Sequence, residues 1–259
     1  MVRIYNKRDF EKMKVAGRLT AKILNALDDF IKVGTTTQEI DDFCVDMIKK
    51  GGGISACLGY HGYPKNVCTS INDVVCHGIP DNTKLKDGDI INVDVTTIVD
   101  GYFGDASKMY CVGNGFNSGL YDDRKKLVNI TKECLEIGIK TAKPGVKLVE
   151  IGRKIQRHAE KNGFSVVRDY CGHGCGKVFH DEPSVLHYEP SIFERRYVDL
   201  ILKPGMIFTI EPMINAGDWR LYVEKENGWT ARTKDGSLSA QWEHTIGITE
   251  NGNVIFTQE

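Results

Sequence analysis

Four carboxylates and one histidine stand in short motifs that could hold metal ions. They are Asp94 in INVDVT, Asp105 in GYFGDAS, His173 in CGHGCG, Glu211 in FTIEP and Glu243 in AQWEH. The acids have apolar or aromatic neighbours, and acids in such surroundings are rarely left unpaired because burying an isolated charge is costly. The glycines beside His173 would let the backbone approach a ligand closely. These residues are candidates for one shared, oxygen-rich site.

The charges of this set decide what the site could be. Two carboxylates about 4 Å apart repel by about 4 kcal/mol at an effective dielectric constant of about 20. Lys177, which follows CGHGCG, is the one basic residue that these motifs offer, so it cannot neutralise four acids. Two divalent ions would neutralise them all. Oxygen ligands with one imidazole suit Mn, Fe, Co or Zn rather than a thiolate zinc site.

The segment around the first two acids predicts a β-hairpin. Asp100 and Gly101 form a two-residue turn signal between two β-rich runs, which is the strongest short-range hairpin pattern. Pairing about this turn places Asp105 opposite Thr96, and Thr96 shares a strand face with Asp94. The two acids are then diagonal neighbours, roughly 7 Å apart at the backbone. Taken alone, the hairpin favours the alternative of two acids on a solvated sheet face, and the acids of the second half reverse that preference.

Two further histidines lie in turn-bounded motifs close to the candidate ligands. His77 stands in VCHGIP and His180 in VFHDEP. Both are expected to form hydrogen bonds with a substrate amide or with a developing oxyanion. The other histidines are expected outside the chemistry: His61 at the wall of the pocket, His244 on the strand face opposite Glu243, and His158 and His187 at the surface.

The elements that must position these residues form an α+β pattern. Helices are expected over 9–31, 37–50, 121–142 and 148–161, and Thr36 with Glu39 has the spacing of a capping box. Strands are expected near 66–70, 90–99, 102–112, 164–170, 207–212, 220–225 and 242–256. Two helix pairs would cover a mostly antiparallel sheet.

Two internal echoes predict a duplicated domain. LKDGDIINVD at 85–94 and LKPGMIFTIE at 202–211 share a pattern at an offset of 117, and each ends on a carboxylate. A G-x4-E-I pattern recurs upstream at an offset of 111. We expect a single catalytic domain over 1–259, made of halves at roughly 1–120 and 121–259, whose equivalent carboxylates face each other across the centre.

Composition excludes several classes of protein. The 259 residues carry a net charge of -1, so there is no basic surplus for general nucleic-acid binding. No apolar run of about 18 residues could span a membrane, and the first residues lack the apolar stretch of a secretory signal. Eight cysteines in a chain of this length are expected as free thiols. We therefore expect a cytoplasmic protein with no membrane partner and no specific nucleic-acid partner.

The motifs, in their order, resemble the methionine aminopeptidases. The similar segments are SACLGYHGYPKNVCTSINDVVCHGIPD, INVDVT, GYFGDASKMY, YCGHGCGKVFHDEP, LKPGMIFTIEPMINAG and SLSAQWEHTI, which span nearly the whole chain. The short interval from Glu211 to Glu243 and the absence of a large N-terminal domain resemble the bacterial-style type 1 enzymes of peptidase family M24. Cys175 and Trp242 depart from the commoner residues without removing a ligand. The resemblance implies the duplicated pita-bread (creatinase/aminopeptidase) fold.

The resemblance also implies roles for individual residues. Asp94 would hold one metal, Asp105 and Glu243 would bridge two, and His173 with Glu211 would hold the other. His77 and His180 would contact the substrate. The pocket for the methionine side chain would be formed by Cys57, Tyr60, Tyr63, Cys68, Phe179 and Trp229. A monovalent cation, Na or K, would be held at Asn72, Val74 and Ser239.

The activity implied by the resemblance is removal of the N-terminal methionine from nascent proteins when the second residue is small. A water activated by two metal ions would attack the methionine carbonyl, and Glu211 would carry a proton to the leaving amine. The enzyme is expected to be a monomer, and the ribosome is a candidate partner.

Three other interpretations are open from the residues. A metal-free pita-bread protein could bind peptides or nucleic acid, but such relatives lack the ligand set. CGHGCGKV could suggest nucleotide binding, but no Ser or Thr follows Lys177 and the Walker spacing is absent. A structural zinc at Cys171, His173 and Cys175 is disfavoured because such tight spacing cannot easily supply a tetrahedral set.

Overall fold

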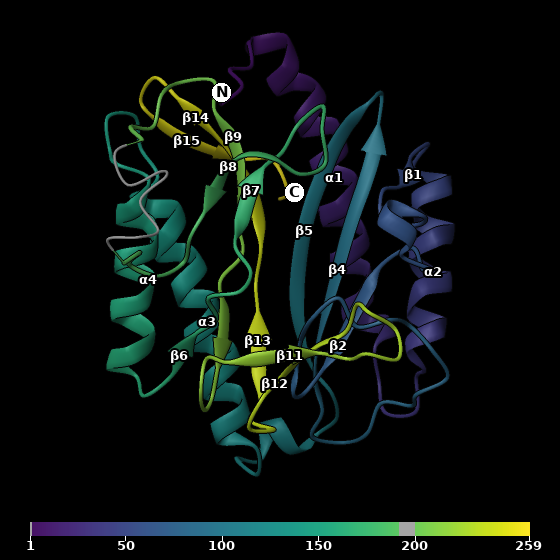
Figure 1. Cartoon of the computed structure of the whole chain (residues 1–259). Coiled ribbons are helices and arrows are strands. Elements are labelled where there is room, and N and C mark those ends of the chain that lie inside the picture. The colour runs from purple at the N-terminus through teal and green to yellow at the C-terminus, as the bar shows by residue number, and fades with distance from the viewer. Residues whose placement is uncertain (1, 192–199) are drawn as a thin grey trace.

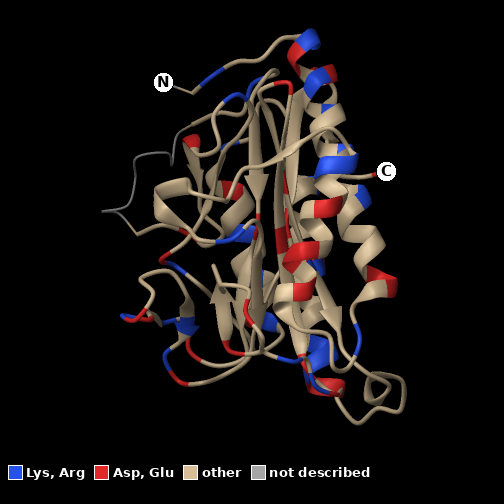
Figure 2. Ribbon diagram, turned by 90° about the vertical axis from the view of Figure 1, so that its right-hand side faces the viewer, with Lys and Arg blue, Asp and Glu red and all other residues tan. Residues whose placement is uncertain are grey.

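The computed structural model describes residues 2–191 and 200–259. Its helices gather on one side of the β-sheets and its longer loops on the other (Figures 1 and 2). Helix α1 (Lys7–Phe30) packs on strands β4 and β5, while α3 (Asp122–Thr141) packs on β9, β10 and β13. The α+β class is confirmed, with one helix pair in each half of the chain.

The first helix pair is fixed by two capping boxes. Helix α2 (Thr37–Lys50) begins at the predicted Thr36–Glu39 box. Helix α1 begins two residues earlier than predicted, because the Asn6 side chain accepts hydrogen bonds from the first turn while Asp9 bonds back to the Asn6 N–H. In the second pair, α3 is followed by α4 (Val149–Lys161). Each pair buries its own apolar cluster against the strands beneath it.

The central hairpin has the predicted register. Strands β4 (Ile90–Val99) and β5 (Tyr102–Cys111) pair antiparallel along ten residue pairs, and Thr96 lies opposite Asp105. Asp100 and Gly101 adopt φ values of 50° and 76°, as the tight turn requires. Strands β1 (Ile54–Ser55) and β2 (Cys68–Ile71) follow one another along the other edge of β4. Cys68 is therefore placed opposite Asp94.

The second half forms shorter strands than the sequence predicts. The run predicted at 164–170 is reduced to β6 (Ser165–Val166), and the run at 242–256 is a hairpin of β14 (His244–Thr249) and β15 (Gly252–Ile255). The five-stranded sheet has the order β15-β14-β9-β7-β8, with β9 at Ile207–Ile210, β7 at Gly172–Gly174 and β8 at Asp181–Val185.

Two small sheets complete the fold. One joins β13 (Ser239–Gln241), β10 (Met213–Asn215) and β6, and the other joins β11 (Leu221–Val223), β12 (Ala231–Thr233) and β3 (Val74–Cys76). The second of these carries residues from both halves of the chain, so it ties them together. Descent of the halves from one duplicated unit stays a prediction.

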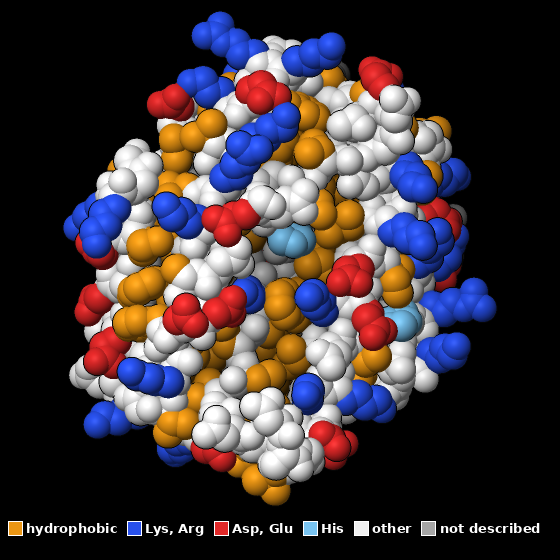
Figure 3. All heavy atoms as spheres, turned by 180° about the vertical axis from the view of Figure 1, so that it is seen from behind, with side chains coloured by type: hydrophobic (Ala, Val, Ile, Leu, Met, Phe, Trp, Pro, Cys, Tyr) orange, Lys and Arg blue, Asp and Glu red, His pale blue; other side chains and the backbone are white. Residues whose placement is uncertain are grey.

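The helix-bearing face is charged along the helices and apolar between them (Figure 3). A furrow between α1 and α3 is lined by Leu24, Leu135, Ile139, Trp242 and Ile255, among others. Within the described ranges, no helix is both long enough and apolar enough to cross a membrane.

Candidate metal centre and substrate cavity

A cavity of about 260 Å³ lies where the sheets of the two halves meet. It is lined by all five predicted metal ligands, both predicted substrate histidines and all six residues predicted for the methionine pocket. The complete lining is Cys57, Tyr60, Tyr63, Cys68, Cys76, His77, Asp94, Thr96, Asp105, Tyr170, Cys171, His173, Phe179, His180, Glu211, Met213, Trp229, Gln241 and Glu243. The structure thus brings together residues that are up to 186 positions apart between Cys57 and Glu243.

The first-half acids face the cavity from the central hairpin. Asp105 is 3% exposed, and the Thr96 hydroxyl donates to its Oδ1 at 2.6 Å. Asp94 is on the same sheet face, and its Oδ1 is buried without a hydrogen-bond partner. A buried carboxylate oxygen without a partner is costly. Binding to a cation would offset this cost, so this oxygen is a candidate ligand atom.

The second-half acids come from the ends of neighbouring strands. Glu211 follows β9, and its two oxygens accept hydrogen bonds from the Thr209 hydroxyl at 2.7 Å and the Gln241 amide at 3.3 Å. Glu243 lies between β13 and β14, and its N–H donates to the Ser107 carbonyl of β5 at 3.1 Å. That hydrogen bond crosses from one half to the other. The backbone of Glu243 is therefore held against the central hairpin, while Glu211 is held by residues of its own half.

His173 stands between acids of both halves. Its Nε2 is 3.5 Å from Asp105 Oδ2 and 3.5 Å from Glu211 Oε1. Its Nδ1 lies 3.1 Å from the Gly174 carbonyl oxygen, which can only accept, so Nδ1 carries the proton and Nε2 remains a lone-pair donor for a metal. Ligand atoms of Asp105, His173 and Glu243 lie within 4.8 Å of one another.

The glycines beside His173 have a different role from the predicted one. A Cβ on Gly172 would lie 2.5 Å from the Thr209 carbonyl oxygen, and a Cβ on Gly174 would lie 2.2 Å from the Glu182 carbonyl oxygen. These glycines therefore admit the neighbouring strands β9 and β8, not a ligand. The close strand packing is what brings the imidazole to the acids.

Burial dominates the electrostatics of the cluster. It raises the pKa of Asp94, Glu211 and Glu243 well above the usual range, with repulsion from neighbouring acids adding to the effect. Burial also raises the pKa of Asp105 to about 7 and lowers the pKa of His173 to about 4. Among the described residues, no lysine or arginine lines this cavity. The donor set is therefore one that divalent cations fit, and it would be neutralised by two of them.

The two predicted substrate histidines lie beside the acids. His77 adopts a φ of 56° and contacts Tyr170 edge to face at 5.1 Å. His180 has its Nδ1 2.8 Å from the Tyr60 hydroxyl, and its ring centroid is 4.1 Å from that of His173. Burial lowers the pKa of His77 to about 4 and that of His180 to about 3. Both rings are therefore neutral near pH 7.

The predicted methionine pocket forms one apolar cluster. Phe179 contacts Tyr60 at 4.8 Å between ring centroids, and Tyr63 contacts Trp229 edge to face at 5.2 Å. Cys57 and Cys68 belong to the same buried group. Aromatic rings and thiols make favourable contacts with a thioether. The chemistry of this wall therefore suits a methionine side chain.

Sequence reasoning placed two histidines wrongly. His187, expected at the surface, is 1% exposed, and its Nε2 accepts the Glu211 N–H at 3.1 Å. His61 is exposed and does not line the cavity. His244 is directed away from the cavity as predicted, with Nδ1 2.8 Å from the Thr257 hydroxyl. The His187 loop carries no local pattern that signals burial, because its partner is 24 residues away.

Several residues of the cavity wall were not predicted. They are Cys76, Thr96, Tyr170, Cys171, Met213 and Gln241. Strand alternation could have found two of them, since Thr96 follows Asp94 by two positions and Gln241 precedes Glu243 by two. Cys175, of the alternative zinc site, is buried with its Sγ 3.5 Å from the Phe103 carbonyl oxygen and is not part of the lining.

The residues predicted for a monovalent cation lie outside this cavity. The Asn72 side chain is already engaged: its Oδ1 accepts from Ile90 N–H and from Arg124, and its amide donates to Asp89. The Ser239 hydroxyl is buried and has no hydrogen-bond partner. Any ligand role for Asn72 therefore falls to its main-chain oxygen.

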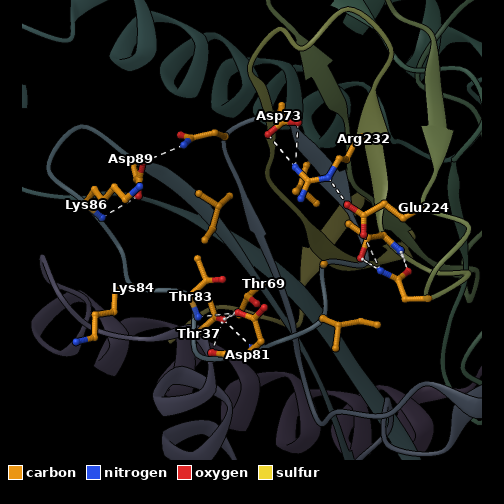
Figure 4. A pocket seen from close by; sticks show the side chains of 17 residues that line it. Thr37, Thr69, Asp73, Asp81, Thr83, Lys84, Lys86, Asp89, Glu224 and Arg232 are labelled. Carbon is orange, nitrogen blue, oxygen red and sulfur yellow. Dashed lines mark hydrogen bonds and ion pairs between the residues drawn. The ribbon is translucent and has the colours of Figure 1, made fainter.

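A larger cavity of about 490 Å³ lies beside the β3–β12 sheet, and its acids are all engaged (Figure 4). Asp73 and Glu224 both accept from Arg232, Asp81 accepts from the Thr83 N–H at 2.8 Å, and Asp89 accepts from the Lys86 N–H at 2.8 Å. The larger cavity thus has basic residues beside its acids, whereas the described lining of the smaller cavity has acids and no lysine or arginine.

Comparisons with known proteins show which family the chain resembles and confirm the predicted pita-bread fold. Residues 11–250 match the metallopeptidase family M24. The chain is 55% identical over 258 residues to a methionine aminopeptidase of Salmonella typhimurium, covering 99% of this chain and 94% of that protein, and 53% identical over the same length to that of Escherichia coli K12. The crystal structure of the Rickettsia prowazekii methionine aminopeptidase is 49% identical, with a TM-score of 0.93 over 99% of this chain and 100% of that one. A Pyrococcus furiosus prolidase, 22% identical with a TM-score of 0.73, shares the fold.

Proposed function

The chain belongs to metallopeptidase family M24, and from that premise we propose how its cavity works. Its activity is that of a methionine aminopeptidase, a metal-dependent hydrolase that removes an N-terminal methionine. The observation that carries the proposal is that four carboxylates and one imidazole line one cavity, beside an apolar pocket lined by aromatic rings and thiols.

The five clustered residues are proposed as ligands of two divalent ions drawn from Co, Mn, Fe and Zn. Asp94 would belong to one ion, Asp105 and Glu243 to both, and His173 with Glu211 to the other. The unpartnered Oδ1 of Asp94 and the unprotonated Nε2 of His173 support this assignment. Bound ions would supply Lewis acidity and lower the pKa of a water molecule.

The substrate is proposed to bind with its methionine side chain against Phe179 and Trp229. Its free α-amine, in the neutral form, would then bind at the metal centre that the carboxylate cluster holds. Only the first residue of a peptide carries a free amine, so this arrangement would make the enzyme an exopeptidase. From the similarity to methionine aminopeptidases we propose that the second residue must be small, because a larger one would clash near the metal centre.

Residues from both halves of the chain are proposed to donate or transfer protons. If the Tyr60 hydroxyl donates to His180 Nδ1, then His180 Nε2–H can donate to the scissile carbonyl oxygen as negative charge develops there. His77, also neutral, would hold the amide. Glu211 would take a proton from the attacking water and deliver it to the leaving amine.

Several finer properties are proposed on the same basis. Nascent chains would be the substrates, the ribosome is a candidate partner, and the enzyme would act as a monomer in the cytoplasm. A sodium or potassium ion would bind at main-chain oxygens of Asn72 and Val74 with Ser239. The alternative of a metal-free binding protein is not favoured, because all five candidate ligands are present and converge.

Hydrolysis of two tripeptides tests the proposal. Purified protein is stripped with a chelator and then given Met-Ala-Ser or Met-Leu-Ser with Mn, Co, Fe or Zn. We expect no cleavage after chelation, recovery with a divalent metal, and cleavage of Met-Ala-Ser only. Equal cleavage of both peptides would refute the proposed restriction on the second residue, and metal-independent cleavage would refute the ligand assignment.

A further inference from the structure

The N-terminal segment lies across the loop that carries Phe179 and His180. Arg3 Nε is 2.9 Å from Asp181 Oδ2, the Tyr5 hydroxyl accepts the Lys177 N–H at 3.1 Å, and Lys177 Nζ is 2.8 Å from Asp9 Oδ1. We call Arg3, Tyr5 and Asp9 the N-terminal clamp, and residues 175–181 the His180 loop. This loop joins β7 to β8, and Figure 1 shows the N-terminal end of the chain near β8 and β9.

Asp9 joins three elements at one buried point. It is 7% exposed, and it accepts from the Tyr102 hydroxyl of β5 at 2.6 Å, from the Asn6 N–H at 2.9 Å and from Lys177. Although burial acts to raise it, hydrogen bonds from Lys177, Tyr102 and Asn6 lower the pKa of Asp9 to about 2. The carboxylate therefore stays charged and keeps the start of α1, β5 and the loop together.

Tyr5 is packed directly on the loop backbone. Gly176 has a φ of 148°, and a Cβ at this position would lie 2.3 Å from the Tyr5 hydroxyl oxygen. The carbonyl of Gly176 accepts the Phe103 N–H at 2.8 Å, and the Phe103 ring stacks on Phe179 at 5.5 Å. Contacts on both sides of the loop therefore fix the position of its backbone relative to the cavity.

The clamp also explains what Lys177 does. The sequence offers this lysine as the one positive charge close to the acid cluster. Its ammonium instead pairs with Asp9 and lies over the Tyr102 ring at 5.3 Å. Lys177 thus holds the loop at a point two residues before Phe179 and three residues before His180. Arg3 holds the loop at Asp181, just after His180.

We propose that the N-terminal clamp positions two residues of the cavity wall. Arg3, Tyr5 and Asp9 act through Lys177 and Asp181 to hold Phe179 and His180 against the substrate. The inference rests on the proposed role of His180. None of the clamp residues lines the cavity, so they are positioning residues. A displacement of about 1 Å at a group that stabilises the transition state can lower the rate by about a hundredfold.

A double-mutant cycle tests this proposal. Asp9→Asn keeps the size of the side chain but removes its charge, and Asp100→Asn is the matched control, because Asp100 forms an exposed ion pair with Lys12 of the same helix. With Met-Ala-Ser, Asp9→Asn should lower kcat by about tenfold or more, and Asp100→Asn should leave it unchanged. In a His180→Ala background, Asp9→Asn should cause less than a twofold further loss.

Two readouts separate positioning from general damage. The bound metal content of Asp9→Asn should equal that of the wild type, and the ring resonances of His180 in an NMR spectrum should shift in Asp9→Asn but not in Asp100→Asn. If Asp9→Asn does not fold, Tyr5→Phe, which removes only the acceptor of the Lys177 N–H, takes its place in the same cycle.

The outcomes that overturn the proposal are distinct from those that overturn the proposed function. An equal loss of kcat in the wild-type and His180→Ala backgrounds, unchanged kcat, or unchanged His180 resonances would each overturn the clamp. A wild-type protein that does not cleave Met-Ala-Ser would overturn the proposed function instead, and the NMR comparison would still decide whether the clamp positions His180.

Discussion

Replacing Asp105 by Asn should stabilise the metal-free protein while abolishing its activity. The substitution preserves the size of the side chain, and the Asn oxygen can still accept the hydrogen bond that Thr96 donates to Oδ1. What it removes is a buried negative charge beside Asp94, Glu211 and Glu243. The carboxylate that we propose as a metal ligand therefore destabilises the folded protein when no metal is bound.

The magnitude follows from the pKa of Asp105. Burial raises it from 3.8 to about 7, which corresponds to about 4 kcal/mol between the protonated and ionised forms. Because the folded protein holds this proton more tightly than the unfolded chain, the unfolded chain loses it first as the pH rises. Stability is therefore full below about pH 4, falls as the pH rises, and has lost about 4 kcal/mol above about pH 7.

Urea unfolding of chelated protein at pH 5 and pH 8 measures this effect. The wild type should be less stable at pH 8, and Asp105→Asn should exceed the wild type at pH 8 by up to about 4 kcal/mol while differing less at pH 5. Adding a divalent metal should reverse the order at pH 8. If the chelated wild type were equally stable at both pH values, or if Asp105→Asn were less stable than the wild type at pH 8, the electrostatic reasoning would be wrong.

Three other substitutions probe the remaining parts of the site. Glu243→Ala should lower kcat by at least about a thousandfold and reduce the metal content measured by atomic emission, with an unchanged far-ultraviolet circular dichroism spectrum. Trp229→Ala should lower kcat/KM for Met-Ala-Ser by about tenfold or more by removing apolar contact from the methionine side chain; an unchanged value would show that Trp229 does not contact that side chain. His187→Ala should lower the free energy of unfolding by about 1 to 3 kcal/mol, because it leaves the Glu211 N–H buried without an acceptor; urea titration measures the loss, and none is expected for the exposed His61→Ala.

Local patterns in the sequence were sufficient for the parts of the site that lie within one element. The Asp100–Gly101 turn and strand alternation placed Asp105 opposite Thr96, and the hairpin has that register. The capping box at Thr36 placed the start of α2 correctly. Such features depend on neighbours a few residues away, so the chain itself specifies them.

The predictions that failed depend on distant partners. His187 was expected at the surface, but it is buried and its ring accepts a hydrogen bond from the Glu211 N–H. Gly172 and Gly174 looked like space for a ligand, but the strands β9 and β8 occupy that space. The strand predicted over 164–170 is shortened to two residues, since only Ser165 and Val166 find a partner in β10.

The sequence by itself therefore determined which side chains could carry the chemistry, the register of Asp94 and Asp105, and the family to which the chain is similar. Only the tertiary structure decided that Glu211 and Glu243 come to the same point as those two acids, that Lys177 pairs with Asp9 instead of with them, and that the N-terminus supports the His180 loop. The physical reason is that turns, caps and strand alternation are set by neighbouring residues, whereas the distance between two halves of a chain is set by how their cores pack.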